Sequence, residues 1–273
     1  MKFCGIILNR NLPKVTDKLF YNLKKNNKNL DVFIVESGSD KNKTSKNMTW
    51  HANWPQAKKN GLRYYRGMNY GLRKLYDENK FYNYDAFILL SNDTLFKNYN
   101  ITKKLTKILN KHERIGLLSP CAKDWGEYKI IDNFEKIKYF WFIHSPVYVF
   151  RRSFIDDIKN TSKPGFKNFL FDGSNFRGFG LESEIIMKAY SNDWAAAITK
   201  DIIFQENENL LIQNFEKIKT ENYSLNTVLF IEEGFKWMKK KYGFDSKWSM
   251  QMFVKCFYDK FFESNPVFEN YKI

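Results

Sequence analysis

Short apolar runs in the first 120 residues predict buried β-strands. Three of them cover residues 3–8, 31–35 and 86–90, and a fourth covers residues 115–118. Polar residues bound each run. Runs of this length with few polar interruptions are typical of strands that are covered on both faces of a sheet.

Helices are predicted between these strands. After Thr16, which we expect to be the N-cap, apolar residues recur at helical spacing up to a polar end at residues 24–29. Residues 67–79 and 102–111 show the same spacing. Strand and helix therefore alternate, which predicts an α/β fold with a mostly parallel sheet and helices on both of its faces.

In sheets of this kind, ligands bind beyond the carboxyl ends of the strands. Two of the predicted strands end in polar loops, which begin at Glu36 and at Ser91. We therefore expect both loops to face one crevice.

The pattern changes after residue 120. Aromatic residues dominate residues 139–150, and a glycine- and aromatic-rich loop is expected over 168–180, followed by a helix at 181–190 and a strand at 195–204. Residues 215–273 are expected to be largely helical. These changes divide the chain into residues 1–120, 121–214 and 215–273, without a linker or an internal repeat.

The charge follows the same division. The net charge is +15, and residues 1–120 alone hold 23 Lys and Arg against 9 Asp and Glu, a surplus of 14. Residues 121–214 carry −1 and residues 215–273 carry +2. A basic half of this kind indicates a phosphate-rich partner, although a lysine-rich composition that only keeps the protein soluble has the same signature.

Cysteine spacing and hydropathy limit the class of protein. The three cysteines are far apart and form no CxxC pair, which is typical of free thiols in a reducing compartment. No apolar stretch reaches the roughly 20 residues that span a bilayer. We expect a cytoplasmic protein, either soluble or attached peripherally to the inner face of the membrane. The glycine motifs of dinucleotide-binding and P-loop enzymes are also missing from the sequence.

Polar loops after two of the strands hold the first candidate residues. Asn92 and Asp93 follow the strand at 86–90, where a carboxylate can hold Mg²⁺ or Mn²⁺ that bridges a diphosphate. The loop from Glu36 to Asp40 offers acceptors and donors for a base and a ribose. Helix caps and turns use the same residue types, so a structural role is the alternative in both places.

A pair of carboxylates is the third candidate. Glu182 and Glu184 follow a glycine-rich loop and open the helix at 181–190. Carboxylates at a helix start stabilise the helix dipole, and this is the structural interpretation. A carboxylate behind a flexible loop also suits a general base above a crevice.

The order of these motifs resembles glycosyltransferase family 2, which has the GT-A fold. Residues 32–40 (VFIVESGSD) resemble the family's strand and Asp-Asn-x-Ser-x-Asp motif, and residues 66–72 (RGMNYGL) resemble its helix start beneath the nucleotide. Residues 87–94 (FILLSNDT) resemble a variant of its Asp-x-Asp motif. Residues 147–152 (VYVFRR) resemble the strand before its acceptor loop, and residues 180–185 (GLESEI) resemble the motif of its catalytic base. The resemblance implies a Rossmann-like, mostly parallel mixed sheet with a C-terminal helical extension.

The resemblance also implies a reaction and a set of site residues. The protein would transfer a sugar from a nucleotide-diphosphate sugar, a UDP-sugar, to an acceptor hydroxyl with inversion. Donor-binding residues would be Glu36, Ser37, Ser39, Asp40, Arg66, Asn69, Asn92 and Asp93. Asp93 would hold Mn²⁺ or Mg²⁺, and Glu182 or Glu184 would be the base. The half formed by residues 1–120 would bind the donor, and residues 121–214 would bind the acceptor.

Two positions depart from the family pattern. Ser183 stands where the family has its catalytic Asp, and Gln205 stands where it often has a metal-binding His. These departures leave open a catalytically silent GT-A-like binding protein. For an enzyme, the acceptor is a saccharide or a lipid-linked saccharide, or alternatively a modified base in DNA. The basic and aromatic segment 215–273 would contact a membrane, cover the acceptor, form a dimer contact or pack back on the catalytic domain.

Overall fold

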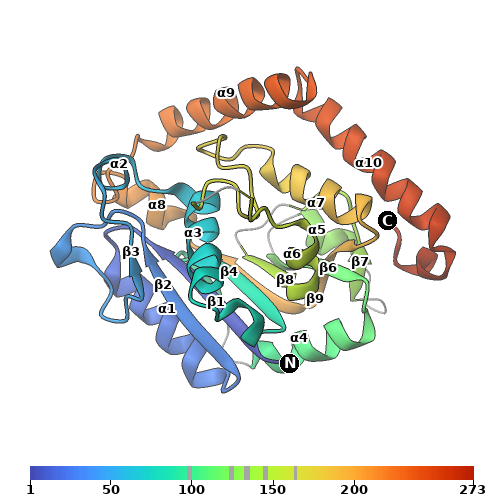
Figure 1. Cartoon of the computed structure of the whole chain (residues 1–273), viewed down its shortest axis with the longest axis horizontal. Helices are drawn as coiled ribbons and strands as arrows, with labels where there is room; N and C mark the ends of the chain where they lie inside the picture. The colour runs from blue at the N-terminus through green and yellow to red at the C-terminus, as the bar shows by residue number, and fades with distance from the viewer. Residues whose placement is uncertain (97–99, 123–125, 132–135, 144–146, 163–164) are drawn as a thin grey trace.

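The computed structural model describes residues 1–273 apart from 97–99, 123–125, 132–135, 144–146 and 163–164. Part of the aromatic run 139–150 therefore lies outside the described residues. In the described part, a single mixed sheet forms the centre of the molecule (Figure 1). Its strands are β1 (Phe3–Asn9), β2 (Leu30–Glu36), β3 (Trp50–His51), β4 (Ala86–Ser91), β5 (Thr94–Phe96), β6 (Ile115–Ala122), β7 (Ile137–Tyr139), β8 (Val147–Arg151) and β9 (Ala195–Glu206).

The sheet is mostly parallel, as the alternating pattern predicts. The strand order is β3-β2-β1-β4-β8-β6-β9-β5, and β7 also pairs with β9. Strands β3, β2, β1 and β4 are parallel to one another, and β6 is parallel to β9. Strand β8 runs antiparallel between β4 and β6. The sheet therefore joins residues from both sides of position 120.

Helices lie around this sheet and along one side of the molecule (Figure 1). They are α1 (Pro13–Asn26), α2 (Pro55–Asn60), α3 (Arg63–Asp77), α4 (Ile101–Lys111), α5 (Gly126–Ile130), α6 (Arg152–Ile158), α7 (Leu181–Ser191), α8 (Glu208–Asn214), α9 (Tyr223–Tyr242) and α10 (Lys247–Ser264), with 3-10 turns η1 (Lys41–Lys43), η2 (Phe81–Asn83) and η3 (Pro266–Tyr271). Among the described residues, no helix is long and apolar enough to cross a membrane.

The start of α1 differs from the prediction. The helix begins at Pro13, and Thr16 lies buried inside its first turn. Proline suits this position because its fixed φ is helical and the first turn needs no N–H donor. The Thr16 hydroxyl is 2.9 Å from Asn9 Oδ1 and 3.1 Å from the Leu12 carbonyl oxygen. Thr16 therefore joins the helix to the end of β1 and is not an N-cap.

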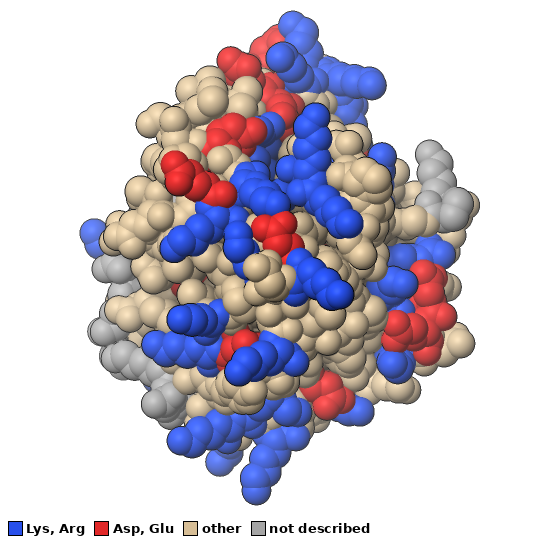
Figure 2. All heavy atoms as spheres, turned by 90° about the vertical axis from the view of Figure 1, so that its left-hand side faces the viewer, with Lys and Arg blue, Asp and Glu red and all other residues tan. Residues whose placement is uncertain are grey.

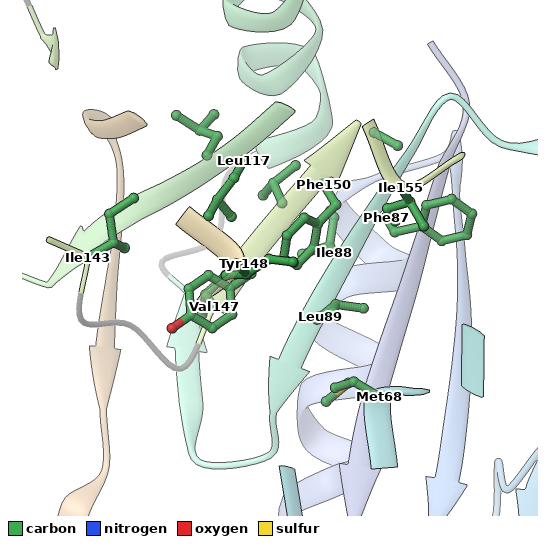
Figure 3. Close-up of a cluster of buried hydrophobic side chains, with 14 of the residues drawn as sticks. Met68, Phe87, Ile88, Leu89, Leu117, Ile143, Val147, Tyr148, Phe150 and Ile155 are labelled. Atoms are coloured by element: carbon green, nitrogen blue, oxygen red, sulfur yellow. The ribbon is translucent and has the colours of Figure 1, made fainter. Parts of the chain in front are cut away.

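Many of the aromatic residues fill the core. Figure 3 shows Phe87 of β4 and Tyr148 and Phe150 of β8 within one cluster of buried side chains. The rings of Phe81 and Phe87 stack with centroids 4.8 Å apart. Large rings fill the wide space between a sheet and its helices without leaving polar atoms unpaired, which is why this chain can use so many of them.

The C-terminal helices pack back on the rest of the chain. Helix α10 lies against α7, and Tyr258 is completely buried there. Its ring centroid is 5.3 Å from that of Tyr190 in α7. Of the arrangements considered for residues 215–273, packing back on the rest of the chain is thus present in the structure.

Candidate functional site

A cavity of about 630 Å³ lies at the carboxyl ends of the central strands. Its walls come from the ends of β1, β4 and β9, from α2, α3 and α7, and from the C-terminal segment. Its lining residues include Arg10, Ser37, Arg63, Tyr64, Tyr65, Asn92, Asp93, Arg177, Phe179, Glu182, Glu206, Phe215, Ile218, Thr220, Glu221 and Lys247.

Both polar loops predicted to share a crevice reach this cavity. Ser37 comes from the loop after β2, and Asn92 and Asp93 come from the turn after β4. Strands β2 and β4 are the two parallel neighbours of β1, so their carboxyl ends lie at the same edge of the sheet. The sheet topology alone brings the two loops together.

Asn92 and Asp93 are held firmly at this edge. Asn92 Nδ2 donates to Thr16 Oγ1 at 3.0 Å and to Asn9 Oδ1 at 3.3 Å. Asp93 is 1% exposed, and its backbone oxygen accepts a hydrogen bond from the Asn207 N–H at 3.0 Å. The carboxylate of Asp93 is therefore presented to the cavity by a rigid turn.

Glu206 is a second carboxylate at this wall, and no sequence motif had pointed to it. It is the last residue of β9 and pairs in register with Thr94, the residue after Asp93. Gln205, at the position of the family's histidine, is exposed and does not line the cavity. Successive side chains of a strand point to opposite faces, so a shift of one residue changes which side chain the cavity receives.

We tested whether these residues suit a divalent metal. The described residues contain no group of three or more His, Cys, Asp and Glu side chains placed to hold an ion. Asp93 and Glu206 nevertheless offer two carboxylates at one wall. Mg²⁺ commonly binds one or two protein carboxylates and completes its shell with water and substrate phosphates. The pair therefore fits an ion that arrives with a diphosphate.

Glu182 also lines the cavity, from the first turn of α7. One of its oxygens accepts a hydrogen bond from the Gly180 N–H at 3.1 Å, and the other is 3.2 Å from Lys247 Nζ of α10. Gly180 precedes α7 and has φ +90°, a backbone conformation that suits glycine. In this conformation its N–H points to the Glu182 carboxylate. Glu182 is thus the member of the predicted pair that lines the cavity.

Glu184 points elsewhere. It is 2% exposed, and its Oε1 accepts hydrogen bonds from Lys241 Nζ at 2.6 Å and from Tyr242 Oη at 2.7 Å. Both partners belong to the end of α9. Ser183 between the two glutamates is also buried. The contacts of Glu184 fasten α7 to α9.

Glu36 is enclosed by hydrogen bonds at the end of β2. It is completely buried, and its carboxylate accepts from Asn9 Nδ2 at 2.9 Å, from Ser39 Oγ at 2.5 Å and from the Ser45 N–H at 2.7 Å. Ser39 in turn accepts from the Asn11 N–H at 3.1 Å. This network shapes the loop from inside, and Ser37 is the residue of the loop that lines the cavity.

Three other residues assigned to the donor by resemblance make structural contacts. Asp40 forms ion pairs with Lys43 and Lys219. Arg66 donates from Nε to the Gly173 carbonyl oxygen at 2.5 Å and lies over the Phe176 ring. Asn69 is completely buried, and its amide bonds to the backbone of residues 167–171. These contacts hold loops around the cavity.

The cavity also has a basic side that sequence analysis missed. Arg10 follows β1, Arg63 opens α3, and Arg177 comes from the loop before α7. Burial lowers the pKa of Arg10 to about 10, and the neighbouring charge of Arg63 acts in the same direction. No sequence pattern indicates that these three arginines meet. Arg63 has φ +56°, in the left-handed region, and this conformation cannot be read from the sequence.

Tyrosines complete the wall near Asp93. Burial raises the pKa of Tyr64 and of Tyr65 well above the usual value, so both phenols keep their protons. The Tyr64 hydroxyl donates to the Leu89 carbonyl oxygen at 3.1 Å. The wall is therefore apolar in its bulk with fixed polar positions, which is common in ligand sites.

The chain has the GT-A fold. The chain is similar in structure to S. aureus TarS 1-349 in complex with UDP, with TM-score 0.51 and 14% identity, over 88% of this chain and 74% of that one. It is also similar to the mannosyltransferase PcManGT from Pyrobaculum calidifontis in complex with GDP-Man and Mn²⁺, with TM-score 0.51 and 11% identity, over 95% and 86%.

A third similar structure is GalNAc-T7 with UDP, GalNAc and Mn²⁺, with TM-score 0.56 and 10% identity, over 90% of this chain and 57% of that one. No known protein family and no curated protein matches the sequence. At these identities the comparison establishes the fold, so the reaction must be argued from the residues of the cavity.

Proposed function

We propose that the protein is a glycosyltransferase that moves a sugar from a nucleotide-diphosphate sugar to an acceptor hydroxyl. The observation that carries the proposal is the joint presence of Asp93 and Glu182 in one cavity at the carboxyl ends of a GT-A sheet. The three similar structures contain UDP or GDP-Man, which supports a nucleotide-sugar donor. We propose a UDP-sugar.

Asp93 and Glu206 would hold a divalent ion together with the donor. A bound Mg²⁺ or Mn²⁺ would stabilise the negative charge that develops on the departing diphosphate. Two of the similar structures contain Mn²⁺, which supports this assignment. In the protein, the buried turn after β4 keeps the Asp93 carboxylate in place, so little reorganisation is needed when the donor arrives.

Glu182 is proposed as the general base. Its carboxylate would accept the proton of the acceptor hydroxyl while the acceptor oxygen bonds to the anomeric carbon and the bond from that carbon to the diphosphate breaks. The attack in line with the leaving group inverts the anomeric configuration. Because Glu182 lines the cavity, whereas Glu184 does not and is directed to Lys241 and Tyr242, we assign the base to Glu182.

A saccharide or lipid-linked saccharide is the acceptor that we propose. Figure 2 shows many Lys and Arg side chains and fewer acidic ones on the side of the molecule where α2 and β3 lie. Exposed lysines of this region include Lys41, Lys46, Lys58 and Lys59. Such a face suits an acceptor that carries phosphate, because several positive charges attract it from solution.

The test is release of the nucleoside diphosphate from a panel of nucleotide sugars in the presence of Mn²⁺. We expect slow hydrolysis by the unmodified protein and none by Asp93→Asn. Glu182→Gln is expected to reduce turnover by about 100-fold or more, because general bases contribute at least that factor, while UDP binding persists.

Glu184→Gln is the matched control, two residues further along the same helix. Provided that this variant remains folded by circular dichroism, we expect it to keep most of the turnover. Full turnover by Glu182→Gln would show that the base has been assigned wrongly, and no turnover of any nucleotide sugar by the unmodified protein would refute the proposed reaction.

A further inference from the structure

Three arginines and one glutamate meet at the basic side of the cavity. Glu221, in the segment between α8 and α9, has both oxygens engaged: Oε2 is 2.7 Å from Arg63 Nη2, and Oε1 is 2.6 Å from Arg177 Nη2. Arg177 also pairs with Glu233. Arg10 lies near enough to Arg63 for their charges to interact, and it has no ion pair among the described residues.

The guanidinium groups retain unused hydrogen-bond donors. The Nε atoms of Arg10, Arg63 and Arg177 are all buried and have no hydrogen-bond partner within the described part of the chain. The Arg177 side chain is only 8% exposed. Buried N–H groups without acceptors are costly, and all three arginines that carry them line one cavity, so an anion that draws these side chains toward the cavity would relieve the cost.

The charges of this cluster do not balance. Arg10, Arg63 and Arg177 carry three positive charges, and the carboxylates paired with them are those of Glu221 and Glu233. Asp40 also acts on Arg10, but its carboxylate is already paired with Lys43 and Lys219. The contacts of the Glu221 carboxylate lower the pKa of this group to about 2: burial opposes ionisation, but hydrogen bonds from its own backbone, Thr220 and Arg63 outweigh it. Glu221 thus behaves as a bound anion within an arginine-rich pocket.

We infer that Arg10, Arg63 and Arg177 form a phosphate-binding site in which the Glu221 carboxylate holds the place of a phosphate group of the substrate. Carboxylate and phosphate are the two anions whose oxygens match the planar donors of arginine, so one can replace the other on the same guanidinium groups. Replacement would move Glu221 and, with it, the segment between α8 and α9. This inference rests on the proposed transfer reaction for its substrate.

The segment that carries Glu221 is fastened to the donor side of the molecule. Asn11 Nδ2 donates to the Lys217 carbonyl oxygen at 2.7 Å, and Lys219 Nζ is 2.5 Å from Asp40 Oδ1. Phe215, Ile218 and Thr220 of the segment line the cavity. Displacement of Glu221 would therefore change the wall of the cavity as well as its charge.

Inorganic pyrophosphate is the direct probe, measured by calorimetry with Glu221→Gln, Arg63→Gln and the unmodified protein. Glu221→Gln removes the competing charge and is expected to bind pyrophosphate about fivefold more tightly, because a site closed by its own side chain binds in proportion to its open fraction. Arg63→Gln is expected to bind more weakly. Glu216→Gln, an exposed glutamate of the same segment, is the control and should stay within about twofold.

Two phosphates could occupy this site, that of the donor and one on the acceptor. If the site takes the donor's phosphates, saturation with UDP abolishes the binding of pyrophosphate. If the site takes an acceptor phosphate, pyrophosphate still binds in the presence of UDP. Equal or weaker binding by Glu221→Gln overturns the inference. If Glu221→Gln binds pyrophosphate more tightly but no nucleotide sugar is turned over, the phosphate site stands and the proposed reaction fails. If nucleotide sugar is turned over but Glu221→Gln binds pyrophosphate no more tightly, the proposed reaction stands and the phosphate site fails.

Discussion

Individual polar residues around the cavity divide into those that face it and those that build its walls. Asn69 belongs to the second group, although resemblance assigns it to the nucleotide. Its Oδ1 accepts from the Leu170 and Phe171 N–H groups at 3.0 and 2.9 Å, and its Nδ2 donates to the Phe171 carbonyl oxygen at 2.8 Å. A single amide thereby joins α3 to the loop that leads toward Gly178 and Glu182.

Replacing Asn69 with alanine is expected to cost about 2–4 kcal/mol in the free energy of unfolding, since several buried backbone groups lose their partners. Urea denaturation measures the change. Asn192→Ala is the control, because its exposed amide bonds only to neighbouring groups of α7, and we expect a change within about 0.5 kcal/mol. Normal stability with weakened UDP binding would instead support a direct contact between Asn69 and the donor.

At the scale of elements, two glycines allow close packing against the loop before α7, Gly234 on the side of α9 and Gly178 on the side of α3. A side-chain atom added to Gly234 of α9 would lie 2.5 Å from Phe179 Cβ and 2.7 Å from its carbonyl oxygen. Gly178 has φ +95°, and an added Cβ would lie 2.2 Å from the Tyr65 ring. Because Phe179 and Tyr65 line the cavity, the positions of α9 and of the site are coupled.

Gly234→Ala is therefore expected to displace α9, with a loss of about 1–3 kcal/mol, which is the usual range for overpacking, and a loss of donor turnover. Thermal unfolding and release of the nucleoside diphosphate measure the two effects. Gly126→Ala in α5 is the matched control: among the described residues, no atom outside the chain neighbours lies within 4 Å of the added Cβ, so stability and turnover should persist. Equal behaviour of both variants would contradict the close packing of α9.

At the scale of the whole molecule, the sheet of the described residues takes strands from both sides of position 120, and the C-terminal helices lie on α7. Trp237, Met238, Met250 and Tyr258 of these helices are buried. Several cavity residues, among them Glu221 and Lys247, also come from residues 215–273. This segment is part of the same packed structure as the site.

We therefore expect calorimetry to show a single unfolding transition for the full chain. A chain that ends at residue 214 should lose this transition, because α7 then exposes the apolar surface that α10 covers. Trp248→Ala in the full chain is the control: Trp248 is 70% exposed, so the transition should remain near its original temperature. A cooperative transition in the shortened chain would show that the helices form a separate unit.

The sequence was sufficient to predict the alternation of the main strands and helices in residues 1–120 and the meeting of the loops that begin at Glu36 and Ser91 at one crevice. Apolar periodicity encodes the elements, and parallel topology brings strand ends to one edge. Only the tertiary structure decided that Glu206 faces the cavity in place of Gln205, that Lys241 and Tyr242 engage Glu184, and that Glu221 enters from a distant segment. These outcomes depend on side-chain direction and on contacts between residues far apart in the chain, and no local pattern specifies either.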